Sequence, residues 1–360
     1  MRDLLARFHE RGSMRISDLH LKVGSAPAYR VDGSLEVMEG APLDAATVEA
    51  LARAIFTPAE LDQLAARHSA DGSYFSATMQ FRLNCFKDND GLAIAIRALE
   101  PHPPAVEAIG FPNEIWRDIV ERTYGLVLIT GITGAGKSTT VASLLDRIAQ
   151  TQSCRIMTLE DPIEYRLRHG RSLVSQREIG RHLDSFEAGL RDALREDPDV
   201  IFVGEMRDRE SARWVLTAAE TGHLVFSTLH TRDARGTITR VLDMFPANQQ
   251  DEIANQLSLG LAYVICQKLL PRADGQGRVV AMEILNNNYA VQNLIRVGKV
   301  EQLYSQLQTK TRSLPTERMI TMEQSLALLA AEGTVDAAEA TKWANHPQEF
   351  ESALRHLNRE

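Results

Sequence analysis

The sequence predicts an α/β protein in which a small α+β domain precedes a larger domain built on a parallel sheet. Two observations support this prediction. Residues 1–100 carry strand-like segments joined by hairpin-type turns, whereas short apolar strands alternate with helices from residue 113 onwards. A proline-rich stretch, residues 101–112, separates the two patterns and predicts a linker. We therefore expect domains at 1–100 and 113–360, the second with a helical C-terminal part.

The first domain is predicted from three strand-like segments, which are "LHLKV", "AYRVDGSLEVM" and "SYFSATMQFRLNCFKDNDGLAIAIRAL". Asp32-Gly33 and Asp90-Gly91 are typical of hairpin turns. Residues 45–66 predict two helices, broken at Thr57-Pro58. Four prolines between Pro101 and Pro112 then mark the end of the domain.

The second domain is predicted from four short, branched, apolar segments that suit buried parallel strands. They are Leu126–Ile129, Arg155–Leu159, Val200–Val203 and Leu224–Thr228. Beyond Arg240 the pattern favours helices. Residues 248–270, "NQQDEIANQLSLGLAYVICQKLL", predict a helix that ends before Pro271, and a capping box from Thr321 to Gln324 opens another, which stops at Gly333.

Composition limits the possible functions. The chain has 360 residues, of which 44% are hydrophobic and 24% charged, and its net charge of −8 gives no electrostatic reason to bind nucleic acid or an anionic membrane. Cys85, Cys154 and Cys266 form no C-x-x-C pair, which favours three buried thiols in a reducing cytoplasm. No apolar run approaches the roughly 20 residues that span a bilayer, so we expect a cytoplasmic protein.

The stretch "LVLITGITGAGKSTTVASLL", residues 126–145, predicts a phosphate-binding loop. It runs from a strand through G-x-x-x-x-G-K-[ST] into a helix that starts near Lys137. Glycines let backbone N–H groups curl around an anion, and these flanks disfavour an ordinary glycine-rich turn. ATP is the expected ligand, with Mg²⁺ on the Ser138 hydroxyl. The expected binding residues are Thr133, Gly134, Ala135, Gly136, Lys137, Ser138 and Thr139.

Polar residues follow the later strands, where the carboxyl ends of a parallel sheet gather around a ligand. The segments are "RIMTLEDPIEY", "DPDVIFVGEMRD" and "TGHLVFSTLHT", and the residues are Glu160, Asp161, Glu164, Glu205, Arg207 and His230, with His223 at a strand start. Any one acid alone would suit a solvated loop or a helix cap. Together with the loop they predict a hydrolase centre, in which Ser138, Glu160 and Glu205 are candidate metal ligands.

Four boxes resemble those of the secretion ATPases of type II and type IV pilus systems. "GITGAGKST" resembles their Walker A, "LEDPIEY" their acidic box, "DPDVIFVGEMRD" their Walker B and "TGHLVFSTLHT" their histidine box, in the family's order. Similarity extends from Ser17 to about residue 310. The resemblance implies a homohexamer whose subunits combine a PAS-like N-terminal domain with a RecA-like P-loop domain.

The same resemblance implies roles for individual residues. Glu164 and Glu205 would share water activation and metal coordination, with the division between them open. His223 and His230 match the histidine-box pair. In "FRLNCF" and "IAIRAL", Arg82 and Arg97 fall where the family places arginines that reach the phosphates, the alternative being exposed arginines in ordinary ion pairs.

Within the family the chain is most similar to the enzymes that retract type IV pili, since assembly ATPases typically carry two C-x-x-C pairs that are absent here. This implies a Mg²⁺-dependent hexameric ATPase for pilus retraction and twitching motility. It would sit peripherally on the cytoplasmic face of the inner membrane at the pilus base. Its expected partners are a platform protein and other pilus ATPases, without nucleic acid.

Several alternatives remain. Within the class they are an accessory retraction ATPase and a pilus-assembly or type II secretion ATPase. A RecA-like DNA translocase is disfavoured because aromatic residues are only 6% of the chain and no Lys/Arg run exceeds two residues. A nucleotide-dependent regulator with poor turnover is disfavoured by the set of acidic strand ends.

Overall fold

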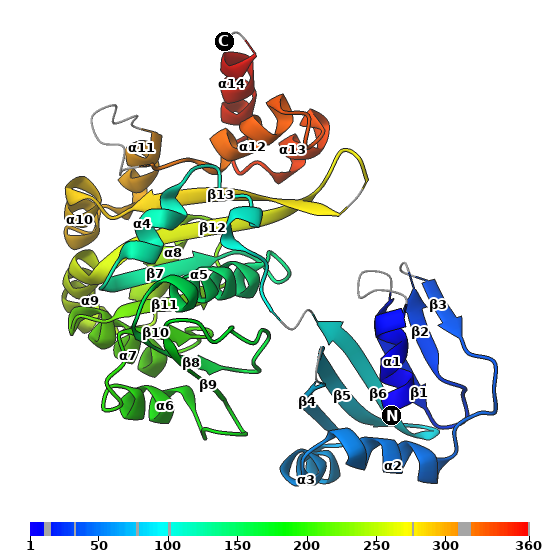
Figure 1. Ribbon diagram of the computed structural model, residues 1–360. Coiled ribbons are helices and arrows are strands. Elements are labelled where there is room, and N and C mark those ends of the chain that lie inside the picture. The colour runs from blue at the N-terminus through cyan, green and yellow to red at the C-terminus, as the bar shows by residue number, and fades with distance from the viewer. Residues whose placement is uncertain are drawn as a thin grey trace. The chain divides into compact units, whose positions relative to one another are not determined.

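The computed structural model describes residues 1–10, 16–31, 34–76, 79–99, 102–275, 277–308 and 318–358. The chain divides into two compact units (Figure 1). The first comprises Met1–His102 together with Pro162–Arg166, and the second comprises Pro103–Asp161 and Leu167–Glu360. The short segment Pro162–Arg166 therefore belongs with the first unit although it follows a strand of the second.

The first unit is an antiparallel sheet with the strand order β3-β2-β1-β6-β5-β4. Its strands are β1 (Ile16–Lys22), β2 (Ala28–Val31), β3 (Ser34–Val37), β4 (Ser69–Phe75), β5 (Gln80–Asp88) and β6 (Gly91–Leu99). A hairpin turn is confirmed here, shifted by one residue from Asp90-Gly91, because Asp88 pairs with Gly91 and the turn consists of Asn89 and Asp90. The turn predicted at Asp32-Gly33 lies outside the described residues.

Three helices complete this unit: α1 (Arg2–Glu10), α2 (Ala45–Ile55) and α3 (Pro58–Arg67). The predicted break at Thr57-Pro58 is confirmed and has a local cause. The Thr57 side chain accepts from the backbone N–H of Glu60, and the Glu60 carboxylate accepts in return from the N–H of Thr57 at 2.6 Å. Edge-to-face contacts of Phe8 with Tyr29 and Phe81 then join α1 to the sheet.

The second unit is built on a seven-stranded sheet with the order β13-β12-β7-β11-β10-β8-β9. Its strands are β7 (Gly125–Thr130), β8 (Arg155–Glu160), β9 (Leu173–Glu178), β10 (Val200–Val203), β11 (Leu224–Leu229), β12 (Leu261–Pro271) and β13 (Arg278–Asn286). Only β13 runs antiparallel to its neighbour. All four predicted parallel strands are confirmed, as β7, β8, β10 and β11, with ends that agree to within one residue.

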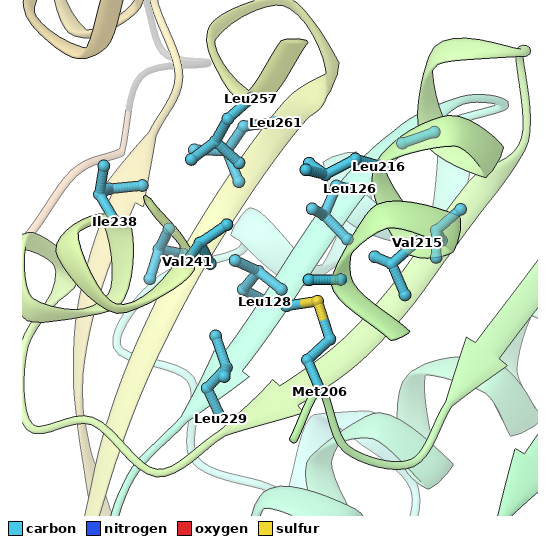
Figure 2. Packing of buried hydrophobic residues seen from close by; sticks show 14 of the residues in the cluster. Leu126, Leu128, Met206, Val215, Leu216, Leu229, Ile238, Val241, Leu257 and Leu261 are labelled. Carbon is cyan, nitrogen blue, oxygen red and sulfur yellow. The ribbon is translucent and has the colours of Figure 1, made fainter. Parts of the chain in front are cut away.

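Helices cover both faces of this sheet. They are η1 (Val106–Ala108), α4 (Ile115–Glu121), α5 (Lys137–Thr151), α6 (Phe186–Ala193), α7 (Arg209–Glu220), α8 (Ala234–Asp243) and α9 (Ala247–Gly260). Leu126 and Leu128 of β7 share one buried cluster with residues of α7, α8 and α9 (Figure 2). Because side chains alternate along a strand, Val127 and Ile129 point to the other face. The strand that leads into the phosphate-binding loop is thus buried on both sides.

The prediction for residues 248–270 is wrong in its second half. Helix α9 ends at Gly260, and the chain continues as β12, which pairs with β7. A strand that is buried on both faces is an unbroken apolar run, and such a run does not distinguish a strand from a buried helix. The β-branched and aromatic residues in "LAYVIC" favoured the strand. Likewise β13 replaces part of the region expected to be helical.

The remaining helices form the C-terminal part. They are α10 (Tyr289–Arg296), η2 (Val300–Gln302), α11 (Leu303–Gln308), α12 (Met322–Ala331), α13 (Ala337–Trp343) and α14 (Pro347–Leu357). Helices α12 to α14 pack in one cluster with Leu270 of β12 and Ala281 of β13. The predicted capping box is confirmed at Thr321, and Gly333 beyond the helix adopts a φ of +70°.

The three cysteines are free, as expected, but only Cys85 and Cys266 are buried. Cys154 is half-buried, because it lies in the connection just before β8, which the prediction did not foresee. No helix within the described residues is long and apolar enough to cross a bilayer.

Removing the cap of α12 tests the local stability of the C-terminal part. Thr321→Ala deletes the hydroxyl that accepts from the N–H of Gln324, which should cost about 1 kcal/mol. We expect amide hydrogen exchange in α12 to become roughly fivefold faster. Thr341→Ala, whose hydroxyl only bonds back to Ala337 within α13, is the control. Equal exchange in both variants would contradict a capping role.

Glu283 on β13 gives a pH test of the same region. Burial raises the pKa of this carboxyl to about 7, and the nearby carboxylates of Asp233 and Glu323 add to the rise, although it accepts a bond from the N–H of Ala234. Between pH 4.5 and 7 the folded chain holds a proton here that the unfolded chain releases. This stabilising contribution is therefore full at low pH and lost as the pH rises through about 7.

Glu283→Gln should remove this dependence. We expect the variant to exceed the wild type in free energy of unfolding by up to about 3 kcal/mol near pH 8, and the gain to vanish near pH 4.5. Urea unfolding at a series of pH values measures it. Glu301→Gln is the control, because Glu301 is an exposed acid that lines a cavity together with Glu283. A gain that does not depend on pH would show that the carboxyl stays ionised in the fold.

Candidate nucleotide site

The phosphate-binding loop joins β7 to α5 and depends on its glycines. Gly134 and Gly136 adopt φ values of +79° and +86°, which favour glycine. At Gly131 a Cβ atom would lie only 2.5 Å from the carbonyl oxygen of Gln267, so no larger residue fits. The N-cap of α5 is Gly136, which has no side chain to accept from the first turn of the helix. An anion such as phosphate suits this terminus.

Lys137 holds its charge inside the curl of the loop. The residue is 9% exposed, and its Nζ donates to the carbonyl oxygens of Gly131 at 2.9 Å and Ile132 at 3.3 Å. Ser138 follows it half-buried, whereas Thr133 and Gly134 are exposed at the mouth of the loop. The loop thus combines a buried ammonium, a helix N-terminus and positive-φ glycines, and these features fit the phosphates of a nucleotide.

The polar residues predicted at the ends of the strands lie at the edge of the sheet that also carries the phosphate-binding loop. Because β7, β11, β10 and β8 are consecutive parallel strands, Glu160, Glu205 and His230 follow neighbouring strands at the same edge. His230 Nε2 lies 3.2 Å from Glu205 Oε1, and Arg207 Nε donates to Glu205 Oε2 at 2.8 Å. The Glu205 carboxylate therefore contacts a histidine through one oxygen and an arginine through the other.

Arg207 also connects two strand ends. Its Nη1 donates to Asp161 Oδ2 at 3.3 Å, just after β8. The bond that it donates to Glu205 raises the pKa of Arg207 above its ordinary value, so the guanidinium stays charged. Both carboxylates keep part of their surface exposed, and pairs of this kind contribute little to stability. Their arrangement matters more for placing charge near the loop.

Glu160 occupies the end of β8 and is 8% exposed. Its Oε1 accepts from Thr158 Oγ1 at 2.7 Å and from Gln176 Nε2 at 3.1 Å. Within the described part of the chain, no three His, Cys, Asp or Glu side chains form a metal-binding group. Hard oxygens at this edge include those of Ser138, Glu160 and Glu205, and such donors fit Mg²⁺, which commonly takes one or two carboxylates together with substrate phosphates.

The predicted histidine pair does not meet within this chain. His223 precedes β11, whereas His230 follows it, so the strand of six residues, about 20 Å long, separates them. The His223 carbonyl accepts from the N–H of Gly125 at the start of β7, and its Nδ1 lies 3.0 Å from the Ala218 carbonyl oxygen. The catalytic role of His223 stays a prediction, because the residue lies at the opposite end of β11 from His230. Its seven-residue spacing from His230 spans a whole strand.

The remaining predicted residues belong to the first unit. Arg82 on β5 and Arg97 on β6 lie directly opposite each other, and like charges in this position repel. Arg97 Nε donates to Asp18 Oδ1 at 2.8 Å. Burial acts to raise the pKa of Asp18, but the bonds from Ser17 and Arg97 lower it below its ordinary value. Arg97 thus has the ordinary ion pair, and Arg82 is exposed.

Glu164 lies half-buried on the segment Pro162–Arg166. Gln80 Nε2 donates to the Ile163 carbonyl oxygen, and the Arg166 guanidinium lies 4.3 Å from the ring centre of Phe75. These contacts attach the segment that carries Glu164 to the first unit, and the catalytic role of Glu164 stays a prediction.

Sequence reasoning missed two residues of β12 beside the loop. Gln267 is buried, and its Nε2 donates to the Ala135 carbonyl oxygen at 2.6 Å. Lys268 Nζ donates to the Trp343 carbonyl oxygen and to Asn345 Oδ1. Both residues border a cavity of about 550 Å³ that also contacts Gly131, a volume in the range of ligand pockets. The available signal was a polar pair inside the apolar run "LAYVICQKLL".

Comparisons with known proteins agree with this geometry. Residues 13–357 match the family model of the Type II/IV secretion system protein. The chain is 41% identical to the type IV pilus retraction ATPase PilT of Pseudomonas aeruginosa over 97% of its length and 99% of that protein. It is 31% identical to the type IV pilus ATPase PilU of the same organism, over 98% of this chain and 90% of that protein.

Among solved structures, the crystal structure of the pilus retraction motor PilT with bound ADP superposes with a TM-score of 0.88. It is 42% identical, and the match covers 97% of this chain and 99% of that one. This match confirms the predicted α/β fold class with its helical C-terminal part. Since the family model spans most of the chain, the protein belongs to the Type II/IV secretion system protein family.

Proposed function

We propose that this protein is an ATP-hydrolysing motor that retracts type IV pili and so drives twitching motility. The observation that carries the proposal is the near full-length similarity to a pilus retraction ATPase, at 41% identity. An intact phosphate-binding loop with acidic strand ends beside it supports ATP hydrolysis as the source of work.

The following chemistry is proposed for the loop and the acids of the site. Lys137 and the N-terminus of α5 bind and orient the phosphates of ATP. Ser138, Glu160 and Glu205 would hold Mg²⁺, which supplies charge neutralisation at the phosphates when it is bound. Glu164 and Glu205 position and deprotonate the attacking water, with the division of roles between them open. Holding the water in line with the bond to be broken accounts for most of the expected acceleration.

His230 and the two arginines complete the proposed site. His230 contacts Glu205 at 3.2 Å and donates to the terminal phosphate, so the loss of that phosphate changes its partner. Arg82 and Arg97 repel each other across β5 and β6, and an anionic ligand would relieve the repulsion. We therefore assign both arginines to the phosphates. The role of His223 stays a prediction.

The assembly is proposed from the family. Six copies form a ring, with residues 101–112 as the hinge between domains 1–100 and 113–360. The ring acts on a platform protein of the inner membrane, together with other pilus ATPases, at the cytoplasmic face of that membrane. Rotation of one domain against the other converts each hydrolysis into displacement.

Two substitutions test the catalytic assignment. Lys137→Ala removes the loop's ammonium and Glu205→Gln removes a carboxylate at the strand edge, so each should lower the rate of ATP hydrolysis by at least about 100-fold. Phosphate release by the purified protein measures the rate, with and without a Mg²⁺ chelator. Lys87→Ala and Glu220→Gln, at exposed residues of β5 and α7, are matched controls. A wild-type rate in either test variant would contradict the assignment.

Deletion of the gene in its native host tests the direction of work. A retraction motor removes pilin from the filament, so its loss should leave abundant surface pili and no twitching. Electron microscopy of the pili and a twitching assay measure both effects, and expression of the wild-type gene from a plasmid is the control. Cells without pili would instead identify an assembly motor. Unchanged twitching would identify an accessory one.

A further inference from the structure

Gln267 lies where β12 meets the phosphate-binding loop. Cys266 of β12 pairs with Thr130, the last residue of β7, so Gln267 follows directly at the level of Gly131. Figure 1 shows β12 beside β7 in the sheet. The residue is 2% exposed, and its Nε2 donates to the Ala135 carbonyl oxygen at 2.6 Å. The contact thus joins the strand to the inside of the loop.

The loop rests on β12 at further points. The Gln267 carbonyl oxygen lies 2.5 Å from the position a Cβ would take at Gly131. A Cβ at Gly136 would lie 3.1 Å from Leu269 Cδ1 and 3.2 Å from Gln267 Nε2. These approaches show that the loop backbone packs directly against β12 and that larger residues at both glycines would crowd the strand.

We propose that Gln267 is a positioning residue for the nucleotide loop, an inference that rests on the proposed function. In a trans peptide unit the C=O and the following N–H point in opposite directions. The amide of Gln267 holds the Ala135 C=O toward β12, so the Gly136 N–H of the same peptide points away from the strand. That direction is the one in which loop N–H groups receive a phosphate oxygen.

Packing alone does not account for a glutamine at this position. Among the described residues, the buried Oε1 of Gln267 has no hydrogen-bond partner. Leaving a buried acceptor unpaired costs free energy, and an apolar side chain would avoid that cost. The amide borders the cavity of about 550 Å³ beside the loop. If the glutamine serves to supply the Nε2 donor, both the bond to Ala135 and the unpaired Oε1 are explained.

Two substitutions at Gln267 test the proposal. Gln267→Leu and Gln267→Met keep much of the side-chain volume and remove the donor. One neutral hydrogen bond corresponds to roughly a fivefold change in binding. We expect the Kd for ADP and the KM for ATP to rise by about that factor, with kcat changed less than about twofold, because the phosphates are bound in both the ground and the transition state.

Asn287→Leu is the matched control. Asn287 is a buried amide whose Nδ2 donates to the carbonyl oxygens of Ser258 and Leu261, both at 2.8 Å. Asn287 follows the last residue of β13, which pairs with the start of β12. It therefore lies at the opposite end of this strand pair from Gln267. This variant likewise removes a buried amide, but it should keep the wild-type Kd and KM.

The outcomes separate the two proposals. A wild type that hydrolyses no ATP overturns the proposed function, whatever the variants do. An active wild type with unchanged Kd and KM in a folded Gln267 variant overturns the positioning role alone. Equal rises in KM in the Gln267 and Asn287 variants would overturn it as well. Loss of folding in both Gln267 variants would show that the residue serves stability instead.

Discussion

The close approach of the phosphate-binding loop to β12 is the constraint on which the rest of the second unit depends. Gly131 has room for no side chain, because the Gln267 carbonyl oxygen fills the space where a Cβ would be. The loop is therefore fixed between the buried strand β7 below it and β12 beside it. Lys137 completes this arrangement by donating to two carbonyl oxygens of the loop itself. A rigid loop of this kind presents its N–H groups without further reorganisation.

The same strand carries the C-terminal helices. Lys268 donates to the Trp343 carbonyl oxygen and to Asn345, and burial lowers the pKa of its ammonium. The buried Glu323 carboxylate accepts from the backbone N–H groups of Asn345 and His346. Two successive residues of β12 thus contact the nucleotide loop and the C-terminal segment.

Much of the fold and part of the candidate site follow from short-range patterns. The phosphate-binding loop, the four parallel strands and the capped starts of α3 and α12 depend on residues within a few positions of one another. Local chemistry decides them: glycine tolerates positive φ, and a threonine hydroxyl caps the helix that follows. The order of the boxes also predicted that Glu160, Glu205 and His230 gather at one edge, because parallel strands share their direction.

Three features depend on contacts between residues that are distant in sequence, and only the tertiary structure decided them. The run after Gly260 became a strand because it pairs with β7, whereas its apolar periodicity alone does not distinguish a strand from a buried helix. His223 and His230 separated because a strand, unlike a loop, holds its two ends apart. Gln267 lies beside Ala135 although the two residues are 132 positions apart in the sequence. The sequence by itself determined which residues could bind phosphate, whereas packing between distant strands determined which of them meet.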